Sequence, residues 1–241
     1  MKLTKEDNSK LELALKACKL AEIDLAVIHE GKIRGMNDSK TAAIISGIDL
    51  TISPDVKWGI TRLGELTQRI HLFSEYDVEG ELTGDQKVKK IIIRGGKGNS
   101  KIDFRCTDIA LLEKKYPKNQ NETAVAVIHM KQAEVALLSK GVKTLGATQV
   151  TIQVKRDGQV HIESSDSSND RFEFDLETSA EFTEDPVGMV NAYDTSNTGV
   201  ILQIIEHMSR NDDIDLVLNA SGIIGLRAYD FDILAIPRID S

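Results

Sequence analysis

The sequence predicts an α+β protein of two similar domains, each built on antiparallel sheets with two helices gathered on one side. Segments that alternate between apolar and polar residues are short and numerous, whereas only four segments have helical periodicity. Helices are therefore too few for a doubly wound parallel sheet, which needs one at nearly every crossover. The segments on the two sides of a mid-chain connector also follow the same order, which indicates an internal repeat.

The first half begins with a helical pattern and continues as a hairpin. One apolar stripe predicts a helix over 9–22, because its members recur at the helical spacing: Leu11, Ala14, Leu15 and Cys18. Alternating strands follow at Leu25–His29 and Lys32–Met36, with a turn at Glu30-Gly31 between them. Three further segments complete this half, namely a helical pattern over 61–72 and strands at Ile91–Ile93 and Ile102–Phe104.

The second half repeats that order. Its apolar stripe predicts a helix over 131–143, a fourth helical pattern covers 197–210, and its strands are Val150–Val154, Gln159–Glu163, Leu216–Leu218 and Leu226–Tyr229. Gly31 corresponds to Gly158 at an offset of 127 positions. The basic pair of the first helix corresponds to that of the third at an offset of 124, which matches Lys16 and Lys19 to Lys140 and Lys143.

The connector between the halves is the segment 113–123, EKKYPKNQNET. It combines a proline with a charge run and a cluster of Asn and Gln, a composition typical of linkers. We therefore predict an N-terminal domain over 1–112 and a C-terminal domain over 124–241. In a chain of 241 residues, each domain is long enough to bury a core of its own.

The composition is that of a globular protein, with 41% hydrophobic and 28% charged residues. The longest apolar runs fall far short of the roughly 18 residues that cross a bilayer, and the first nine residues are polar. Cys18 and Cys106 lie in different segments without a C-x-x-C spacing, which fits a reducing compartment. We therefore expect a cytoplasmic protein, in a host cell if the source is viral, that has no contact with a membrane.

No catalytic or metal-binding motif stands out in the sequence. The five histidines form neither H-x-H nor H-E-x-x-H, which argues against a zinc site. Arg94–Lys101, RGGKGNSK, lacks the spacing of a phosphate-binding loop and runs into a strand pattern, so a hairpin turn is favoured. Ser164–Asp170 lacks the glycine and the glutamate of a calcium loop. We therefore expect no catalytic residue, no metal, no cofactor and no enzymatic activity.

The helical patterns carry more positive charge than the rest of the chain. The net charge is −8, yet the four helical segments together carry nine Lys or Arg and five Glu, which leaves −12 for the remainder. Solvated charges explain any single helix, but four basic faces in an acidic protein indicate a surface suited to backbone phosphates rather than to bases. The candidate DNA-facing residues are Lys10, Lys16, Lys19, Arg62, Arg69, Lys131, Lys140, Lys143, Gln203, His207 and Arg210.

Two short segments and the order of the elements resemble one known family. Residues 33–43, IRGMNDSKTAA, are similar to a clamp stretch in which a strand ends in Met-Asp-x-Ser-His-Val, with Lys40 in place of the His. Residues 234–240, LAIPRID, are similar to the clamp ending Leu-Ala-Pro-Lys-Ile-Glu, and the opening MKLTK resembles that of phage clamps. With its duplication, the chain resembles the sliding clamps of DNA replication, which include proliferating cell nuclear antigen and the clamps of T4-like bacteriophages.

The resemblance implies a closed ring of three identical chains that encircles duplex DNA without sequence preference. Such a ring acts as a processivity factor by tethering the replicative polymerase, and a clamp loader is a further partner. The subunits would join through two strand edges, with the interface residues Lys101, Phe104, Arg105, Phe172, Phe174 and Asp175. Partner peptides would dock in a cleft formed by Met36, Lys40, Thr41, Ala43, Tyr116, Pro117, Leu234, Ile236 and Pro237.

The alternative that the residues leave open is a β-rich oligomeric structural or adaptor protein of a virus that does not encircle DNA. A scaffold of that kind has no reason to gather lysines on its helices. The placement of charge therefore distinguishes the two functions.

Overall fold

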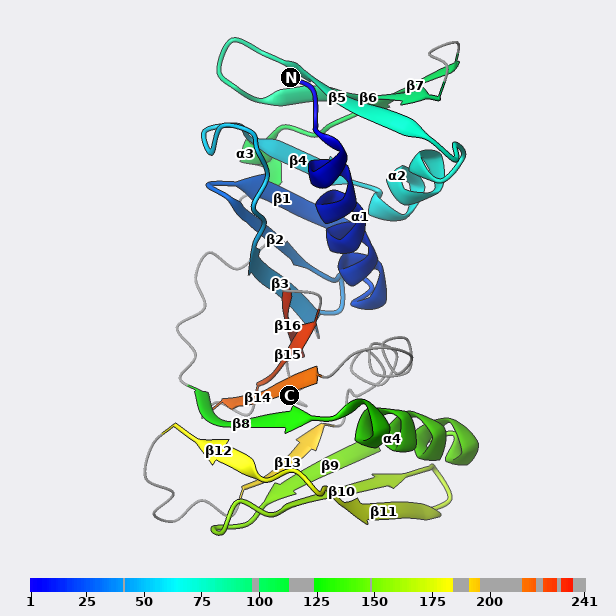
Figure 1. Ribbon diagram of the computed structural model, residues 1–241, viewed down its shortest axis with the longest axis vertical. Coiled ribbons are helices and arrows are strands. Elements are labelled where there is room, and N and C mark those ends of the chain that lie inside the picture. The colour runs from blue at the N-terminus through cyan, green and yellow to red at the C-terminus, as the bar shows by residue number, and fades with distance from the viewer. Residues whose placement is uncertain are drawn as a thin grey trace. The chain divides into compact units, whose positions relative to one another are not determined.

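The computed structural model describes residues 1–40, 42–96, 100–112, 124–147, 149–183, 191–195, 214–219, 223–228 and 231–235 (Figure 1). The chain divides into two compact units. The first comprises Met1–Gln120 with Tyr229–Phe231, and the second comprises Asn121–Ala228 with Asp232–Ser241. The division falls within the segment predicted as a connector, 113–123, which lies outside the described residues.

The first unit combines two antiparallel sheets with helices. The strand orders are β3-β2-β1-β4 and β5-β6-β7, and helices α1 and α2 pack side by side (Figure 1). The elements are α1 (Lys5–Leu20), β1 (Leu25–His29), β2 (Lys32–Met36), β3 (Ala42–Gly47), β4 (Trp58–Thr61), α2 (Leu63–Ile70), β5 (Tyr76–Leu82), β6 (Val88–Gly95), β7 (Ser100–Arg105) and α3 (Ile109–Leu112).

The second unit has the same kind of architecture. Its antiparallel strands follow the orders β12-β8-β14-β15-β16 and β11-β10-β9-β13. The predicted helix over 197–210 lies outside the described residues. The elements are β8 (Ala124–Met130), α4 (Gln132–Leu145), β9 (Gln149–Val154), β10 (Val160–Ser165), β11 (Arg171–Asp175), β12 (Ala180–Phe182), β13 (Asn191–Thr195), β14 (Ile214–Asn219), β15 (Ile224–Ala228) and β16 (Phe231–Ala235).

The predicted α+β class with antiparallel sheets is confirmed, and so is the first predicted hairpin. β1 and β2 have the expected bounds, and the turn between them places Glu30 and Gly31 at φ values of 55° and 66°. Two successive positive φ angles are typical of the tight turns that match the twist of a hairpin. Arg94–Lys101 joins the antiparallel strands β6 and β7, as expected of a hairpin turn. No helix within the described ranges is long and apolar enough to cross a bilayer.

The first helix begins earlier than its apolar stripe predicts, at Lys5 rather than at position 9. Thr4 and Asp7 form a capping box, in which the Thr4 hydroxyl accepts from the Asp7 amide at 3.1 Å and the Asp7 carboxylate accepts from the Thr4 amide at 2.8 Å. These bonds satisfy amides that the first turn of a helix leaves without a partner. The capping box therefore sets the start of α1.

The same acidic side chain ties α1 to the loop after β3. Asp7 is fully buried and also accepts hydrogen bonds from the amide, at 2.7 Å, and the hydroxyl of Thr51. Burial disfavours the charged carboxylate, but the hydrogen bonds from Thr51 and Thr4 outweigh it and lower the pKa of Asp7 to about 2. Asp7 therefore fixes the helix N-terminus and the loop to each other.

The second unit contains the corresponding arrangement. Glu134 accepts from the amide of Lys131 at 2.8 Å, and from the amide and hydroxyl of Thr178 at 3.1 and 3.0 Å. Burial opposes its ionisation, but the hydrogen bonds from Lys131 and Thr178 hold the pKa of Glu134 below its usual value. Each acid lies 127 positions from its counterpart, as does each threonine. The two units therefore repeat a specific interaction as well as an order of elements.

This repeat corrects one sequence-based correspondence. With the capping acids aligned, Lys16 matches Lys143, whereas Lys19 matches Gly146 and Lys140 matches Leu13. The offset of 124 that pairs both lysines with both lysines is therefore wrong by nearly one helical turn. The capping acid fixes the rotational phase of each helix, whereas charge on an exposed face does not.

The buried position of Asp7 generates a stability prediction. We expect Asp7→Asn to lower the free energy of unfolding by about 2 kcal/mol at neutral pH, because the ionised side chain is the better acceptor. The pKa of Asp7 is lower in the folded than in the unfolded state, so its stabilisation is present above about pH 4 and is lost as the pH falls through about 2. Urea unfolding at several pH values measures both effects.

The matched control for this experiment is Asp55→Asn, at an exposed position in the turn between Thr51 and β4. It leaves the urea midpoint unchanged if the loss comes from the buried hydrogen bonds. Equal losses in the two variants contradict the role given to Asp7.

Candidate functional site

The lysines predicted to face DNA lie on exposed parts of α1 and α4. On α1, Lys19 is exposed and Lys16 is partly exposed, whereas the neighbouring Cys18 is buried. On α4, Lys140 and Lys143 are both exposed. Lys19 and Lys140 form no ion pair with another residue of the described ranges. Each helix therefore presents basic groups to solvent, as its periodicity predicts.

Lys10 lies apart from the other α1 lysines. Lys16 follows it by six positions, which at about 100° per residue places the two roughly 120° apart around the helix. Its ammonium contacts Glu6 at 2.9 Å and Asp49 at 3.3 Å, and the hydrogen bonds to Glu6 and Asp49 raise the pKa of Lys10. The structure therefore does not bring Lys10 together with the basic face that the sequence assigns to it.

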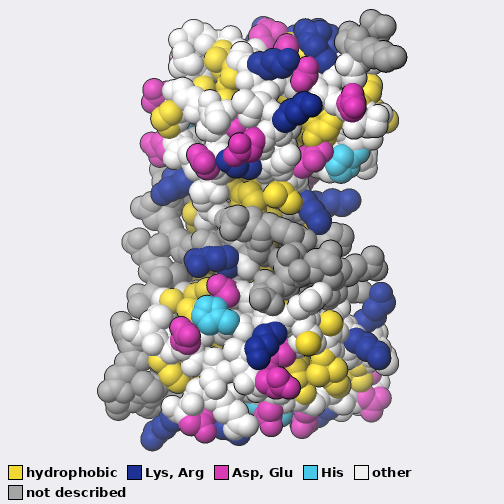
Figure 2. Space-filling view, in the orientation of Figure 1, with side chains coloured by type: hydrophobic (Ala, Val, Ile, Leu, Met, Phe, Trp, Pro, Cys, Tyr) yellow, Lys and Arg dark blue, Asp and Glu magenta, His cyan; other side chains and the backbone are white. Residues whose placement is uncertain are grey.

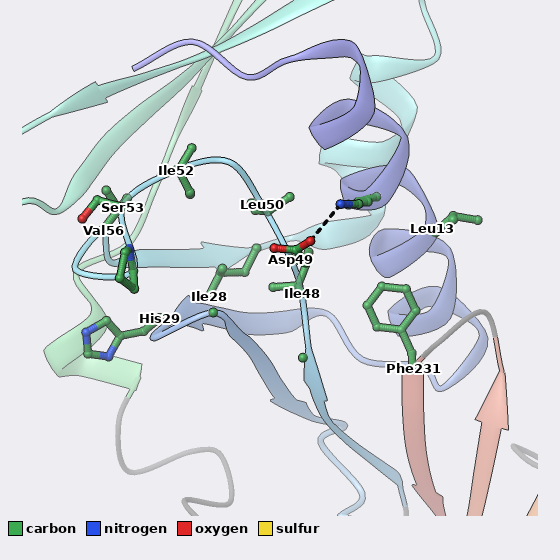
Figure 3. A pocket seen from close by; sticks show the side chains of 14 residues that line it. Leu13, Ile28, His29, Ile48, Asp49, Leu50, Ile52, Ser53, Val56 and Phe231 are labelled. Atoms are coloured by element: carbon green, nitrogen blue, oxygen red, sulfur yellow. Dashed lines mark hydrogen bonds and ion pairs between the residues drawn. The ribbon is translucent and has the colours of Figure 1, made fainter.

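Lys10 is instead one of the residues that line a pocket, which Figure 3 shows beside α1. The pocket has a volume of about 650 Å³, and Ile48, Leu50 and Ile52 contribute to its apolar lining from the loop that follows β3. The sequence analysis missed this pocket. The alternation of these three apolar residues with polar ones is a signal that predicts one inward-facing side of an extended segment.

Arg62, which precedes α2, and Arg69 within α2 both contact groups of their own unit. The guanidinium groups of Arg62 and Arg69 contact the same carboxylate, that of Glu65, at 3.1 and 2.9 Å. Both also lie over the ring of Phe104 on β7, at 5.0 and 5.2 Å from its centroid. They therefore share a face, as the spacing predicts, but part of their charge is neutralised there.

The helices carry acidic residues beside their basic ones. The capping box starts α1 early, which adds Glu6 and Asp7 as well as Lys5 to its first turn. Acidic side chains in the first turn and basic ones in the last complement the helix dipole, which accounts for this distribution. Figure 2 shows Lys and Arg interspersed with Asp and Glu on the face in view. Exposed lysines thus remain, but they do not form an unbroken positive surface on that face.

Two of the sheets end in strands without a neighbour on the outer side among the described residues, β7 in the first unit and β11 in the second. The opposite edge of the β5-β6-β7 sheet is covered by the N-terminal segment, since the Leu3 amide donates to Val78 at 2.9 Å and the Gly80 amide donates to Met1 at 2.7 Å. An uncovered edge presents unpaired backbone groups that accept another strand. The strands predicted to join subunits are thus edge strands.

The side chains of these edge strands divide by face. Lys101, Arg105 and Asp175 are exposed, and Phe172 and Phe174 are partly buried with their rings 5.4 Å apart. Phe172 packs closely on α4, where a Cβ added at Gly141 would come within 2.2 Å of its ring.

Phe104 is the one predicted interface residue that the structure removes from the surface. Its side chain is fully buried within its own unit, under the guanidinium groups of Arg62 and Arg69. Alternation places Phe104 on the inner face of β7, where the helix α2 covers it. Its assignment to a subunit interface is therefore corrected.

Of the residues predicted to form a partner cleft, some are accessible in the structure and others are buried. Met36 lines a small pocket of about 380 Å³ with Asp38 and Arg62 at the turn after β2, and Lys40 is exposed at φ 58°. Ala43 and Leu234 are buried, which corrects their assignment to an open cleft, because a buried side chain is not available to a peptide. The remaining candidates lie outside the described residues: Thr41, Tyr116, Pro117, Ile236, Pro237, Gln203, His207 and Arg210.

Among the described residues, His129 pairs with an acidic side chain of a neighbouring strand, and both cysteines are free. Nδ1 of His129 lies 2.7 Å from Asp215 across two strands, and the hydrogen bond with Asp215 raises the pKa of His129. Burial raises the pKa of the Cys18 and Cys106 thiols to about 12, which disfavours the nucleophilic thiolate form of both. In this part of the chain, no three His, Cys, Asp or Glu side chains gather as a metal site requires.

Solved structures share this fold over nearly the whole chain. One is proliferating cellular nuclear antigen from Entamoeba histolytica, with a TM-score of 0.67 and 12% identity over 99% of this chain and 98% of that one. Another, the C-terminal region of FEN-1 bound to A. fulgidus PCNA, gives a TM-score of 0.70 and 13% identity over 96% of each chain. No protein-family model matches the sequence, and no curated protein matches it.

The burial of Phe104 generates a prediction that separates a core role from an interface role. We expect Phe104→Ala to destabilise the single chain by about 3–5 kcal/mol, because it leaves a cavity under the two guanidinium groups. Thermal unfolding of the dilute protein measures the loss. Ile102→Ala, at a half-buried position of the same strand, is the control and costs less. Unchanged single-chain stability with weakened self-association would instead return Phe104 to the interface.

Proposed function

We propose that this protein, which has the fold of the sliding clamps, acts as one: a processivity factor that encircles duplex DNA and tethers a replicative polymerase. The observation that carries the proposal is the likeness to two PCNA structures over at least 96% of the chain. Tethering raises the local concentration of a polymerase at its primer and needs no catalytic group. The likeness does not favour a viral scaffold that leaves DNA unencircled.

The proposed ring consists of three identical chains joined between β7 of one and β11 of the next. Each is an edge strand of its sheet in the described part of the chain, and each exposes charged side chains. Pairing the two edges hydrogen-bonds backbone groups that otherwise face water. Using each edge once per chain allows the assembly to close on itself.

Four lysines of α1 and α4 with exposed or partly exposed side chains are proposed to face the DNA, namely Lys16, Lys19, Lys140 and Lys143. Each contact with a phosphate is independent of sequence and is easily exchanged for the next one along the duplex. Lys131, exposed before α4, is proposed to contribute as well. Arg62 and Arg69 contribute less in this proposal, because Glu65 already neutralises part of their charge.

Partner proteins are proposed to bind near the turn after β2, where Met36 lines a pocket and Lys40 is exposed. One PCNA structure with the same fold holds the C-terminal region of FEN-1, which supports docking of a terminal peptide on a clamp of this kind. For this chain we propose the replicative polymerase and a clamp loader as partners.

The DNA-facing role predicts a collective effect of the helix lysines. We expect replacement of Lys16, Lys19, Lys140 and Lys143 by Glu to abolish retention on circular DNA while leaving self-association intact, because the salt-dependent attraction grows with the number of phosphates neutralised. Retention of the loaded protein on nicked circles, followed by gel filtration at low salt, measures it. The matched control replaces four exposed cations away from the helices: Lys32, Lys89, Lys155 and Arg156. Equal losses in both sets would remove the helices from this role.

The ring predicts a defined mass. We expect native mass spectrometry to give about 80 kDa, three times the 26.6 kDa of the chain. A species of one chain at all concentrations would contradict the proposed ring.

A further inference from the structure

On the free edge of β7, the backbone N–H and C=O groups of three residues point away from β6. The Cys106 amide donates to Lys89 of β6 at 3.0 Å, and alternate residues of an antiparallel strand point their backbone groups the same way. The backbone groups of Phe104 and Ile102 therefore hydrogen-bond with β6, whereas those of Lys101, Asp103 and Arg105 point away from β6. The next outward amide, that of Thr107, already donates to Gly59 at 2.8 Å, so the free edge ends at Arg105.

The free edge of β11 has the same form. The Leu176 amide donates to Val160 of β10 at 2.9 Å, which directs Phe174 and Phe172 toward β10. The outward backbone groups are therefore those of three charged residues, Arg171, Glu173 and Asp175, all of which have exposed side chains. The outward residues carry a net charge of +1 on β7 and −1 on β11. The two edges are thus complementary in sign.

We infer that the two edges pair antiparallel in a single register, with Lys101 of one chain opposite Glu173 of the next and Asp103 opposite Arg171. This inference rests on the proposed ring and specifies its joint. Outward residues must face outward residues, so the alternative registers differ by steps of two. Each pair in the inferred register joins opposite charges, and on the other face Ile102 lies opposite Phe172.

The neighbouring registers bring like charges together. A shift by two residues one way places Asp103 opposite Glu173 and Arg105 opposite Arg171, which are two repulsive pairs. A shift by four from the inferred register, in the same direction, places Asp103 opposite Asp175. Like charges directly opposite each other destabilise an antiparallel pair, whereas opposite charges stabilise it. The inferred register is the one among these that has no repulsive pair.

The charges within each unit favour the same pairing. Glu173 lies opposite Glu163 in the β10–β11 register, and Glu163 forms an ion pair with the Arg171 guanidinium at 3.1 Å. Glu173 has no cation of its own among the described residues. On the other edge, Lys101 contacts Asp103 at 3.1 Å but shares that carboxylate with Lys90 at 3.3 Å. The β7 edge therefore has a cation in excess opposite a carboxylate that lacks one.

Charge reversal distinguishes the registers by the sign of its effect. In the inferred register, Glu173→Lys places two cations opposite each other, and we expect the concentration for half-assembly to rise about tenfold in sedimentation experiments at low salt. Adding Lys101→Glu to the same chain should restore the wild-type value. In the register shifted by two, Glu173→Lys removes the repulsion between Glu173 and Asp103 and therefore strengthens assembly. In that register Lys101 lies opposite Asp175, so Lys101→Glu would instead rescue Asp175→Lys.

The exposed Asp55→Lys is the matched control, and circular dichroism checks that each variant folds. A weakened single variant with a restored double variant supports the register. A strengthened or unaffected Glu173→Lys overturns it while the wild-type assembly still supports the ring. A wild-type protein that remains a single chain overturns the proposed ring itself, and the register with it.

Discussion

A carboxylate at the third position of the first helix in each unit fixes the relation between that helix and the segment that follows a strand of a sheet. Asp7 binds Thr51 just after β3, and Glu134 binds Thr178 just after β11. Each carboxylate also caps its helix, so the position, the rotational phase and the attachment of the helix depend on one side chain. That rotational phase determines which lysines of α1 and α4 face solvent.

Much of the fold follows from local patterns in the sequence. Alternation fixes β1 and β2 to the residue, and a hairpin turn forms at a pair of residues with positive φ. These features depend on neighbours along the chain, which is the information that periodicity contains. The start of α1 was predictable too, because Thr4 and Asp7 have the spacing of a capping box, whereas the apolar stripe alone placed it four residues late.

The composition of the candidate surfaces depends on contacts between distant segments, which periodicity does not contain. Nothing in the sequence around Lys10 predicts that Asp49 contacts it, and nothing there distinguishes Lys10 from Lys16. The alternation of β7 correctly separates Phe104 from Lys101, but it cannot tell an inner face covered by α2 from an outer face open to another chain. Likewise, nothing local predicts that one carboxylate, Glu65, neutralises part of two arginines.

The covered edge of β5 and the free edge of β7 also bear on the symmetry of any assembly. Because Met1–Leu3 pair with β5, two copies of this sheet cannot join through that side. The free edges β7 and β11 belong to different units of the chain and carry opposite net charge, so a joint between them is head-to-tail rather than two-fold symmetric. Every chain in such an assembly points the same way around, and its two flat sides therefore have different chemistry.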